Sequence, residues 1–197
     1  FHQSLKWLDK AIELNEYLPE LQCNRGNALR NLKKFEDSEA CYRRALEKRP
    51  EFYQAHDQLG NVLVELGRYT DAEASYKRAL EIQPDHLEAA YNLGLLSMAR
   101  LNKSEQAIQY FKIVLKGRPK DSRAMSAMAS AVRRICDWSS YNDIKRELRQ
   151  AVIQGNFLTP FGLIAYSNCA QDLLFCAKTF VANRFSASVT LPRNRHT

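Results

Sequence analysis

The sequence predicts an all-α fold, a solenoid of stacked helical hairpins followed by a short helical capping segment. Three observations lead to this prediction. Small residues and prolines recur every 34 residues, apolar residues recur at helical spacing over runs of about 14 residues, and short polar breaks separate these runs. The recurring residues are Gly26, Gly60 and Gly94, then Ala11, Ala45 and Ala79, then Pro50 and Pro84, with Pro119 after one inserted residue.

Each repeat is expected to hold two antiparallel helices, with breaks at residues 33–34, 67–68 and 102–103. Helices approach closely only where side chains are small, so the glycine of the first helix should face small residues of the second. An aromatic residue of the second helix is expected to fill the space between one hairpin and the next, and the proline turns the chain into the next repeat. The small residues are Ser38, Ala45, Ala72 and Ala79, and the aromatic residues are Tyr42, Tyr76 and Phe111.

These repeats match a known pattern. Segments such as GRYTDAEASYKRALEIQP at residues 67–84 closely resemble the tetratricopeptide repeat consensus. The resemblance covers residues 1 to about 119 as one half unit and three full units, and it implies a right-handed superhelix. Glu16 stands where a proline is usual, Arg25 replaces the usual leucine, and the third unit is one residue longer. We expect these departures to alter local turns and to leave the fold unchanged.

Amide side chains recur in phase on the first helix of each repeat. In a stack of hairpins these helices line the concave face, so the amides should form a row that can donate to and accept from the backbone of an extended peptide. The alternative is an inert surface, but asparagine is a mediocre helix former and its recurrence favours the binding role. The candidate peptide-binding residues are Asn24, Asn27, Gln58, Asn61, Asn92 and the amphipathic Tyr91.

Charged residues near this row indicate what the groove should accept. Asp57, Glu65 and Glu88 predict a mildly acidic groove. Members of the family that bind chaperone tails hold a terminal carboxylate with lysines and an arginine, whereas the corresponding positions here are Cys23, Asp57 and Tyr91. A receptor for C-terminal carboxylates is therefore not expected.

The repeat pattern ends after residues 121–134, which still read as a first helix. A Cys-Asp-Trp-x-x-Tyr motif from Cys136, an amphipathic helix, a proline-containing apolar loop and a further helix follow. This order over residues 133–197 resembles the region that joins repeats to the catalytic domain in O-linked N-acetylglucosamine transferases. The resemblance implies the substrate-recognition and linker part of an enzyme that transfers N-acetylglucosamine from UDP-GlcNAc to Ser or Thr hydroxyls, with its catalytic domain beyond Thr197.

Two functional readings therefore stay open. One divides the chain into repeats at 1–119 and a segment at 120–197 that caps them and begins a glycosyltransferase-like region. The other is a non-catalytic scaffold or co-chaperone, with the last residues as a capping bundle. Neither places a catalytic residue or a bound cofactor in this chain, because the sequence has no phosphate-cradling glycine loop, paired catalytic carboxylates or nucleophile motif. Asp137 is expected to cap a helix, Trp138 and Tyr141 to pack, and Cys136 to be buried.

Composition argues against nucleic acid, membranes and metal ions as partners, and leaves other proteins. The net charge of +7 is uneven, since residues 1–119 carry +1 and residues 120–197 carry +6, and no nucleic-acid-binding motif accompanies the excess. No apolar stretch of 18 residues predicts a membrane span. The four histidines lack ligand-like partners, so no metal is expected, and five cysteines without a CxxC pair favour a reduced, cytoplasmic protein. The cysteines are Cys23, Cys41, Cys136, Cys169 and Cys176.

Overall fold

The computed structural model describes residues 7, 8, 10, 12, 18–136 and 146. The chain divides into two compact units, Phe1–Gly117 and Arg118–Thr197. All regular structure in the described residues is helical, as predicted. The helices are α2 (Pro19–Asn31), α3 (Phe35–Lys48), α4 (Tyr53–Glu65), α5 (Tyr69–Ile82), α6 (Leu87–Ala99) and α7 (Ser104–Gly117) in the first unit and α8 (Ser122–Arg134) in the second.

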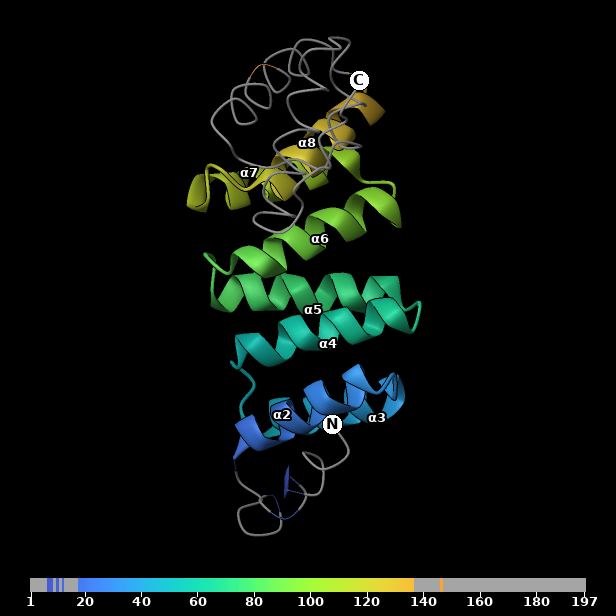
Figure 1. The fold of residues 1–197 in the computed structure, drawn as a ribbon, viewed down its shortest axis with the longest axis vertical. Helices are drawn as coiled ribbons and strands as arrows, with labels where there is room; N and C mark the ends of the chain where they lie inside the picture. The colour runs from blue at the N-terminus through green and yellow to red at the C-terminus, as the bar shows by residue number, and fades with distance from the viewer. Residues whose placement is uncertain (1–6, 9, 11, 13–17, 137–145, 147–197) are drawn as a thin grey trace, which may run out of the picture. The chain divides into compact units, whose positions relative to one another are not determined.

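Residues 18–117 of the first unit form a stack of three helical hairpins. The helices of each pair, α2 with α3, α4 with α5, and α6 with α7, make the most extensive contacts. The second helix of each hairpin also contacts the first helix of the next, so the hairpins follow one another in chain order (Figure 1). This arrangement confirms the predicted solenoid of hairpins.

The turn inside each hairpin lies where the sequence breaks were predicted. Lys33, Gly67 and Asn102 occupy equivalent positions in the three turns, and all have a positive φ, at 60°, 74° and 53°. This left-handed conformation ends the first helix and reverses the chain. The extra residue of the third repeat is accommodated here, because α4 and α6 have equal lengths while the turn after α6 is one residue longer. The prolines also act as predicted, since α3 and α5 each end two residues before Pro50 and Pro84.

The core of each hairpin is an aromatic ring that lies against a glycine. A Cβ atom added to Gly60 would lie 2.6 Å from Cε1 of Tyr76, and one added to Gly94 would lie 2.6 Å from Cε1 of Phe111. These rings were expected to fill the space between hairpins. Each ring also lies on the glycine of its own hairpin, a contact that the sequence did not predict, because only a residue without a Cβ leaves room for it there. Burial of such a ring contributes about 1.5–3 kcal/mol.

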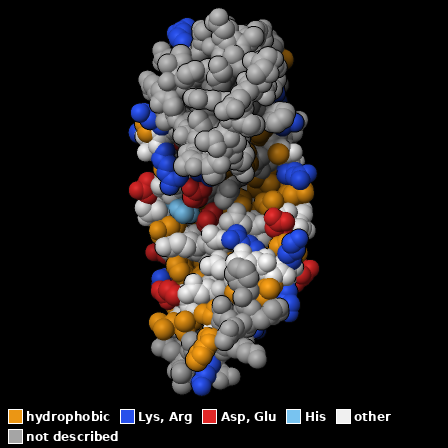
Figure 2. All heavy atoms as spheres, in the orientation of Figure 1, with side chains coloured by type: hydrophobic (Ala, Val, Ile, Leu, Met, Phe, Trp, Pro, Cys, Tyr) orange, Lys and Arg blue, Asp and Glu red, His pale blue; other side chains and the backbone are white. Residues whose placement is uncertain are grey.

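Successive hairpins are joined by a repeated ion pair between a glutamate on one second helix and a cation in the turn before the next second helix. Nζ of Lys103 lies 2.8 Å from a carboxylate oxygen of Glu73, and the guanidinium of Arg68 lies 2.8 Å from Glu39. Glu39 and Glu73 are 34 residues apart, and the cations differ from that spacing by the inserted residue. On the face shown in Figure 2, basic and acidic side chains are interspersed over the hairpins. The pairing agrees with the near-neutral charge of the repeats.

In the second unit, α8 is an amphipathic helix. Asp121 caps it by accepting hydrogen bonds from the backbone N–H groups of Arg123 and Ala124, at 3.0 and 3.1 Å. Such a cap stabilises a helix by about 1 kcal/mol. The apolar face predicted from the sequence is confirmed, because Met125, Met128, Ala129 and Val132 are all buried.

Residues 137–145 and 147–197 lie outside the described part of the chain, and with them the predicted roles of Asp137, Trp138 and Tyr141. Cys136, expected to be buried, is exposed. It lies beyond Val132, the last buried residue of α8, in the exposed stretch 133–136, and it has a φ of 57°. None of the described helices is both long and apolar enough to cross a lipid bilayer.

Candidate peptide-binding groove

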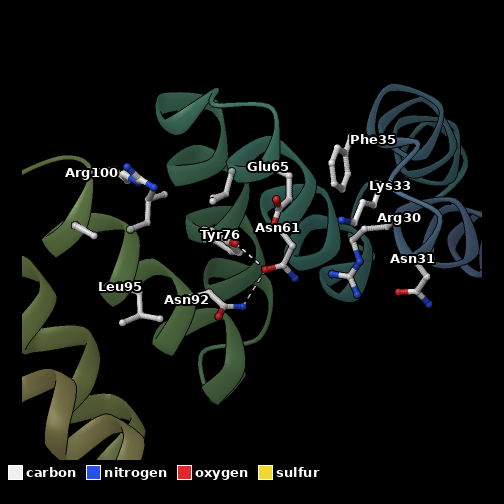
Figure 3. Close-up of a pocket in the computed structure, with 13 residues that line it drawn as sticks. Arg30, Asn31, Lys33, Phe35, Asn61, Glu65, Tyr76, Asn92, Leu95 and Arg100 are labelled. Carbon is white, nitrogen blue, oxygen red and sulfur yellow. Dashed lines mark hydrogen bonds between the residues drawn. The ribbon is translucent and has the colours of Figure 1, made fainter. Parts of the chain in front are cut away.

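A groove of about 560 Å³ is lined mainly by the first helices of the three hairpins, α2, α4 and α6 (Figure 3). Residues at the 34-residue period line it together: Asn31, Glu65 and Ala99 are equivalent, and so are Asn61 and Leu95. The sequence prediction that first helices share one concave surface is therefore supported. The lining residues are Arg30, Asn31, Lys33, Phe35, Asn61, Val64, Glu65, Tyr76, Asn92, Leu95, Leu96, Ala99 and Arg100.

Asn61 lies at the centre of the groove and is held in place by two hydrogen bonds. Its side-chain oxygen accepts from the hydroxyl of Tyr76 at 2.8 Å and from Nδ2 of Asn92 at 3.1 Å (Figure 3). Burial raises the pKa of Tyr76, so the hydroxyl stays protonated and acts as the donor. Both acceptor positions of the Asn61 oxygen are thus occupied by neighbouring side chains.

Asn92 is the amide with hydrogen-bonding capacity left over. One hydrogen of its Nδ2 goes to Asn61. Among the residues that the structure describes, its side-chain oxygen and its other N–H have no partner. The side chain is half-buried in the groove and fixed in orientation by Asn61. It therefore offers one acceptor and one donor from a defined position.

Gln58 connects this pair to a buried acid outside the groove lining. Nδ2 of Asn61 donates to Oε1 of Gln58 at 3.5 Å, and Nε2 of Gln58 donates to Oδ2 of Asp57 at 3.3 Å. Asp57 is only 3% exposed, and Nε2 of His86 lies 3.3 Å from the same Oδ2. Gln58 thus links Asn61 to Asp57 and is not part of the groove lining.

The other predicted residues have different surroundings. The oxygen of Asn27 accepts from the hydroxyl of Tyr42 at 2.7 Å, which copies the Asn61–Tyr76 pair in the first hairpin. Burial raises the pKa of Tyr42 to about 12, so this hydroxyl is also a donor at neutral pH. Asn24 is exposed and has no side-chain hydrogen bond within the described ranges. The ring of Tyr91 packs on Phe111, with centroids 6.0 Å apart.

Of the six predicted residues, the structure brings Asn61 and Asn92 into the groove and leaves the other four outside its lining. The asparagine–tyrosine pairs were missed. A signal for them exists in the sequence: the first two hairpins combine asparagine with tyrosine at these two positions, and the third combines Leu95 with Phe111. The third hairpin therefore lacks both the hydroxyl donor and the amide oxygen that would accept its hydrogen bond.

The charge of the groove differs from the prediction. The lining carries three cations, Arg30, Lys33 and Arg100, and one carboxylate, Glu65. The net charge is therefore +2, and the mildly acidic groove expected from the sequence is wrong. Asp57, one source of that expectation, is buried beside His86. Lys33 and Arg100 were missed because they lie in the turns and at a helix end, outside the helical register used for the prediction.

Comparison with known proteins agrees with this architecture. A family model described as "Tetratricopeptide repeat" matches residues 23–86 and 58–122, which together span more than half of the chain. The sequence matches no curated protein.

Solved structures of tetratricopeptide repeat proteins share the fold. A crystal structure of MamA is 15% identical with a TM-score of 0.66 over 75% of this chain and 84% of its own. The double mutant described as MamA RS-1 ArsTM is 19% identical with a TM-score of 0.69, over 76% and 84% of the two chains. YrrB, described as a TPR protein with an unusual peptide-binding site, is 20% identical with a TM-score of 0.66, over 88% and 90%. At these identities the likeness concerns the fold.

Proposed function

Because the chain belongs to the tetratricopeptide repeat family, we propose that it is a non-catalytic module that binds an extended segment of another protein. The segment lies in the groove formed by α2, α4 and α6. The observation that carries the proposal is the amide of Asn92, which is fixed by Asn61 in the groove with one acceptor and one donor still available. YrrB, described as having a peptide-binding site, is similar in fold.

The chemistry of the groove suits a polypeptide backbone. Each residue of an extended peptide presents one N–H and one C=O, and a single amide side chain can pair with both. Val64, Leu95 and Leu96 add apolar surface against which side chains of the guest can pack. Recognition through the backbone permits many guest sequences, so a range of protein partners is expected.

The transferase reading has less support than the scaffold reading. It rests on the resemblance of residues 133–197, nearly all of which lie outside the described part of the chain. The family model concerns the repeats, and the three solved structures named above are not described as glycosyltransferases. We therefore retain the binding role of the repeats and leave UDP-GlcNAc out of the proposal. Free thiols at Cys23, Cys41 and Cys136 suit a reducing compartment, which favours action in the cytoplasm.

The test compares two asparagines at equivalent positions in different repeats. Fluorescence anisotropy with a library of labelled, extended peptides measures affinity for the whole chain and for two variants. Asn92→Ala should weaken binding about two- to twelvefold, since one hydrogen bond contributes about 0.5–1.5 kcal/mol and about 1.4 kcal/mol corresponds to a factor of ten. Asn24→Ala is the matched control because this residue is exposed and does not line the groove, and it should leave affinity unchanged.

A second arm tests recognition of the backbone. A bound peptide is resynthesised with single N-methyl groups, which remove one backbone donor each and leave every side chain in place. At least one position should lose most of its affinity in the native protein and lose much less in Asn92→Ala. Equal binding by the native protein and both variants, across the library, would refute the proposed role of the groove.

A further inference from the structure

Cationic side chains stand at both ends of the groove. Arg30 and Lys33 come from the end of α2 and the turn after it, and Arg100 comes from the end of α6, on the other side of Asn61 and Asn92 (Figure 3). The described part of the chain provides no ion-pair partner for any of the three. The guanidinium of Arg100 instead lies over the ring of Tyr69, 5.3 Å from its centroid.

The position of these cations in the chain has a simple local cause. Each follows or ends a first helix, where the partial negative charge of the helix C-terminus stabilises a basic residue. That cause does not require the side chains to line the same cavity. Yet all three do, together with a single carboxylate, Glu65, which forms no ion pair with them in the described residues. The groove is therefore positively charged and contains unpaired donors.

We propose that the natural partner is an acidic segment, an inference that rests on the proposed function. This segment is an extended, internal stretch of another protein, and its own Asp or Glu side chains lie at both ends of the groove. Its carboxylates pair with Arg30 and Lys33 at one end and with Arg100 at the other. Its backbone between them meets the amide of Asn92. Arginine suits this role because its planar guanidinium can donate two parallel hydrogen bonds to one carboxylate.

The geometry also indicates which acid is recognised. Asn61 and Asn92 lie between the two cationic ends, so the carboxylates flank a backbone segment and do not require a chain terminus. Glu65 repels the guest and limits its affinity, since a like charge in the same groove opposes binding. Neutralising Glu65 should therefore strengthen the interaction, whereas neutralising a cation should weaken it.

The test uses three labelled peptides of one length, acetylated and amidated so that no terminal carboxylate is present. One alternates Asp or Glu with apolar residues, the second replaces each acid by Asn or Gln, and the third replaces each acid by Lys. Anisotropy should give the acidic peptide about tenfold higher affinity than the neutral one and the basic peptide the lowest. Raising the salt concentration should reduce the preference, because exposed charges are screened over about 10 Å at 0.1 M and about 3 Å at 1 M.

Three variants test one charge at each end of the groove and the single carboxylate, and a fourth variant is the control. Arg30→Gln and Arg100→Gln should each weaken the acidic peptide about three- to tenfold and leave the neutral peptide unchanged, and Glu65→Gln should strengthen the acidic peptide. Arg44→Gln is the control, since Arg44 is exposed on α3 and does not line the groove. Circular dichroism melts establish that each variant is folded.

Each contrary result has its own meaning. Equal affinity for the acidic and neutral peptides would overturn the acidic partner and leave the proposed function intact. Failure of every peptide to bind would overturn both. An oligonucleotide that displaced the acidic peptide at lower concentration than unlabelled acidic peptide would identify a different polyanion and overturn the inference.

Discussion

The pairing of Asn61 with Tyr76 leads to a prediction that the chain itself helps to design. In the third hairpin the equivalent positions hold Leu95 and Phe111, so the protein already contains an apolar version of the same pair. Asn61→Leu and Tyr76→Phe, alone and together, convert the second hairpin to that version. The four proteins form a double-mutant cycle that isolates the coupling between the two side chains.

The magnitudes follow from burial and from the hydrogen bonds that remain. Tyr76 is 2% exposed, so Asn61→Leu strands its hydroxyl without a partner and should cost about 1–3 kcal/mol of unfolding free energy. Tyr76→Phe leaves the oxygen of Asn61 still bonded to Asn92, and we expect a cost of about 1 kcal/mol or less. The double variant should be less destabilised than the sum, with a coupling of about 1 kcal/mol.

Urea denaturation followed by far-ultraviolet circular dichroism measures the four free energies. Asn24→Leu is the control, because Asn24 is exposed and its side chain has no hydrogen bond to lose in the described residues. Strict additivity of the two substitutions would refute the reasoning, since it would mean that the hydroxyl and the amide do not stabilise each other.

Three further predictions concern the packing, the charges and the thiols. Gly60→Ala places a Cβ 2.6 Å from a buried ring and should destabilise the protein by about 1–3 kcal/mol, seen as a lower urea midpoint; an unchanged midpoint would contradict the close contact. Burial alone would raise the pKa of Glu73. Hydrogen bonds from Lys103 and Lys77 outweigh this effect and hold the pKa of the carboxyl below its usual value of 4.5. The resulting stability is present above pH 4.5 and is lost as the pH falls through the lowered pKa, so native protein and Glu73→Gln should differ in melting temperature at pH 7 and converge in acid. Burial raises the pKa of Cys23 to about 12, so a maleimide should label the exposed Cys136 before Cys23, as mass spectrometry of tryptic peptides would show.

Much of the fold could be predicted because a solenoid is specified locally. The turn residues Lys33, Gly67 and Asn102 lie where the breaks in apolar periodicity were seen, and the helix ends precede the prolines. Each of these features depends on residues close in sequence. The contact of each aromatic ring with the glycine of its own hairpin was not predicted, because spacing gives the face of a helix on which a residue lies but not which of two neighbouring helices it contacts.

Less of the groove could be predicted, because its polarity depends on contacts across the hairpins. Register alone grouped Asn24 with Asn92, although one is exposed and the other lines the groove. It likewise treated Asp57 as a groove acid, whereas the side chain is buried beside His86. The first error arises from assuming that equivalent positions in successive repeats have equivalent surroundings, and the second from placing a carboxylate by helical spacing without its partner His86 on the next hairpin.

The same asparagine can stabilise a hairpin or bind a guest, and the hydrogen bonds inside the hairpin decide which. The oxygen of Asn61 is fully occupied by Tyr76 and Asn92, so this residue orients its neighbour and can offer only a donor. Asn92 stands three residues before Leu95, which has no amide to give, and the third hairpin has a phenylalanine that needs none. Asn92 can therefore keep its acceptor for a guest. The binding capacity of such a groove therefore depends on which side-chain donors and acceptors are not already used within the hairpins. A count of polar residues in register overestimates this capacity.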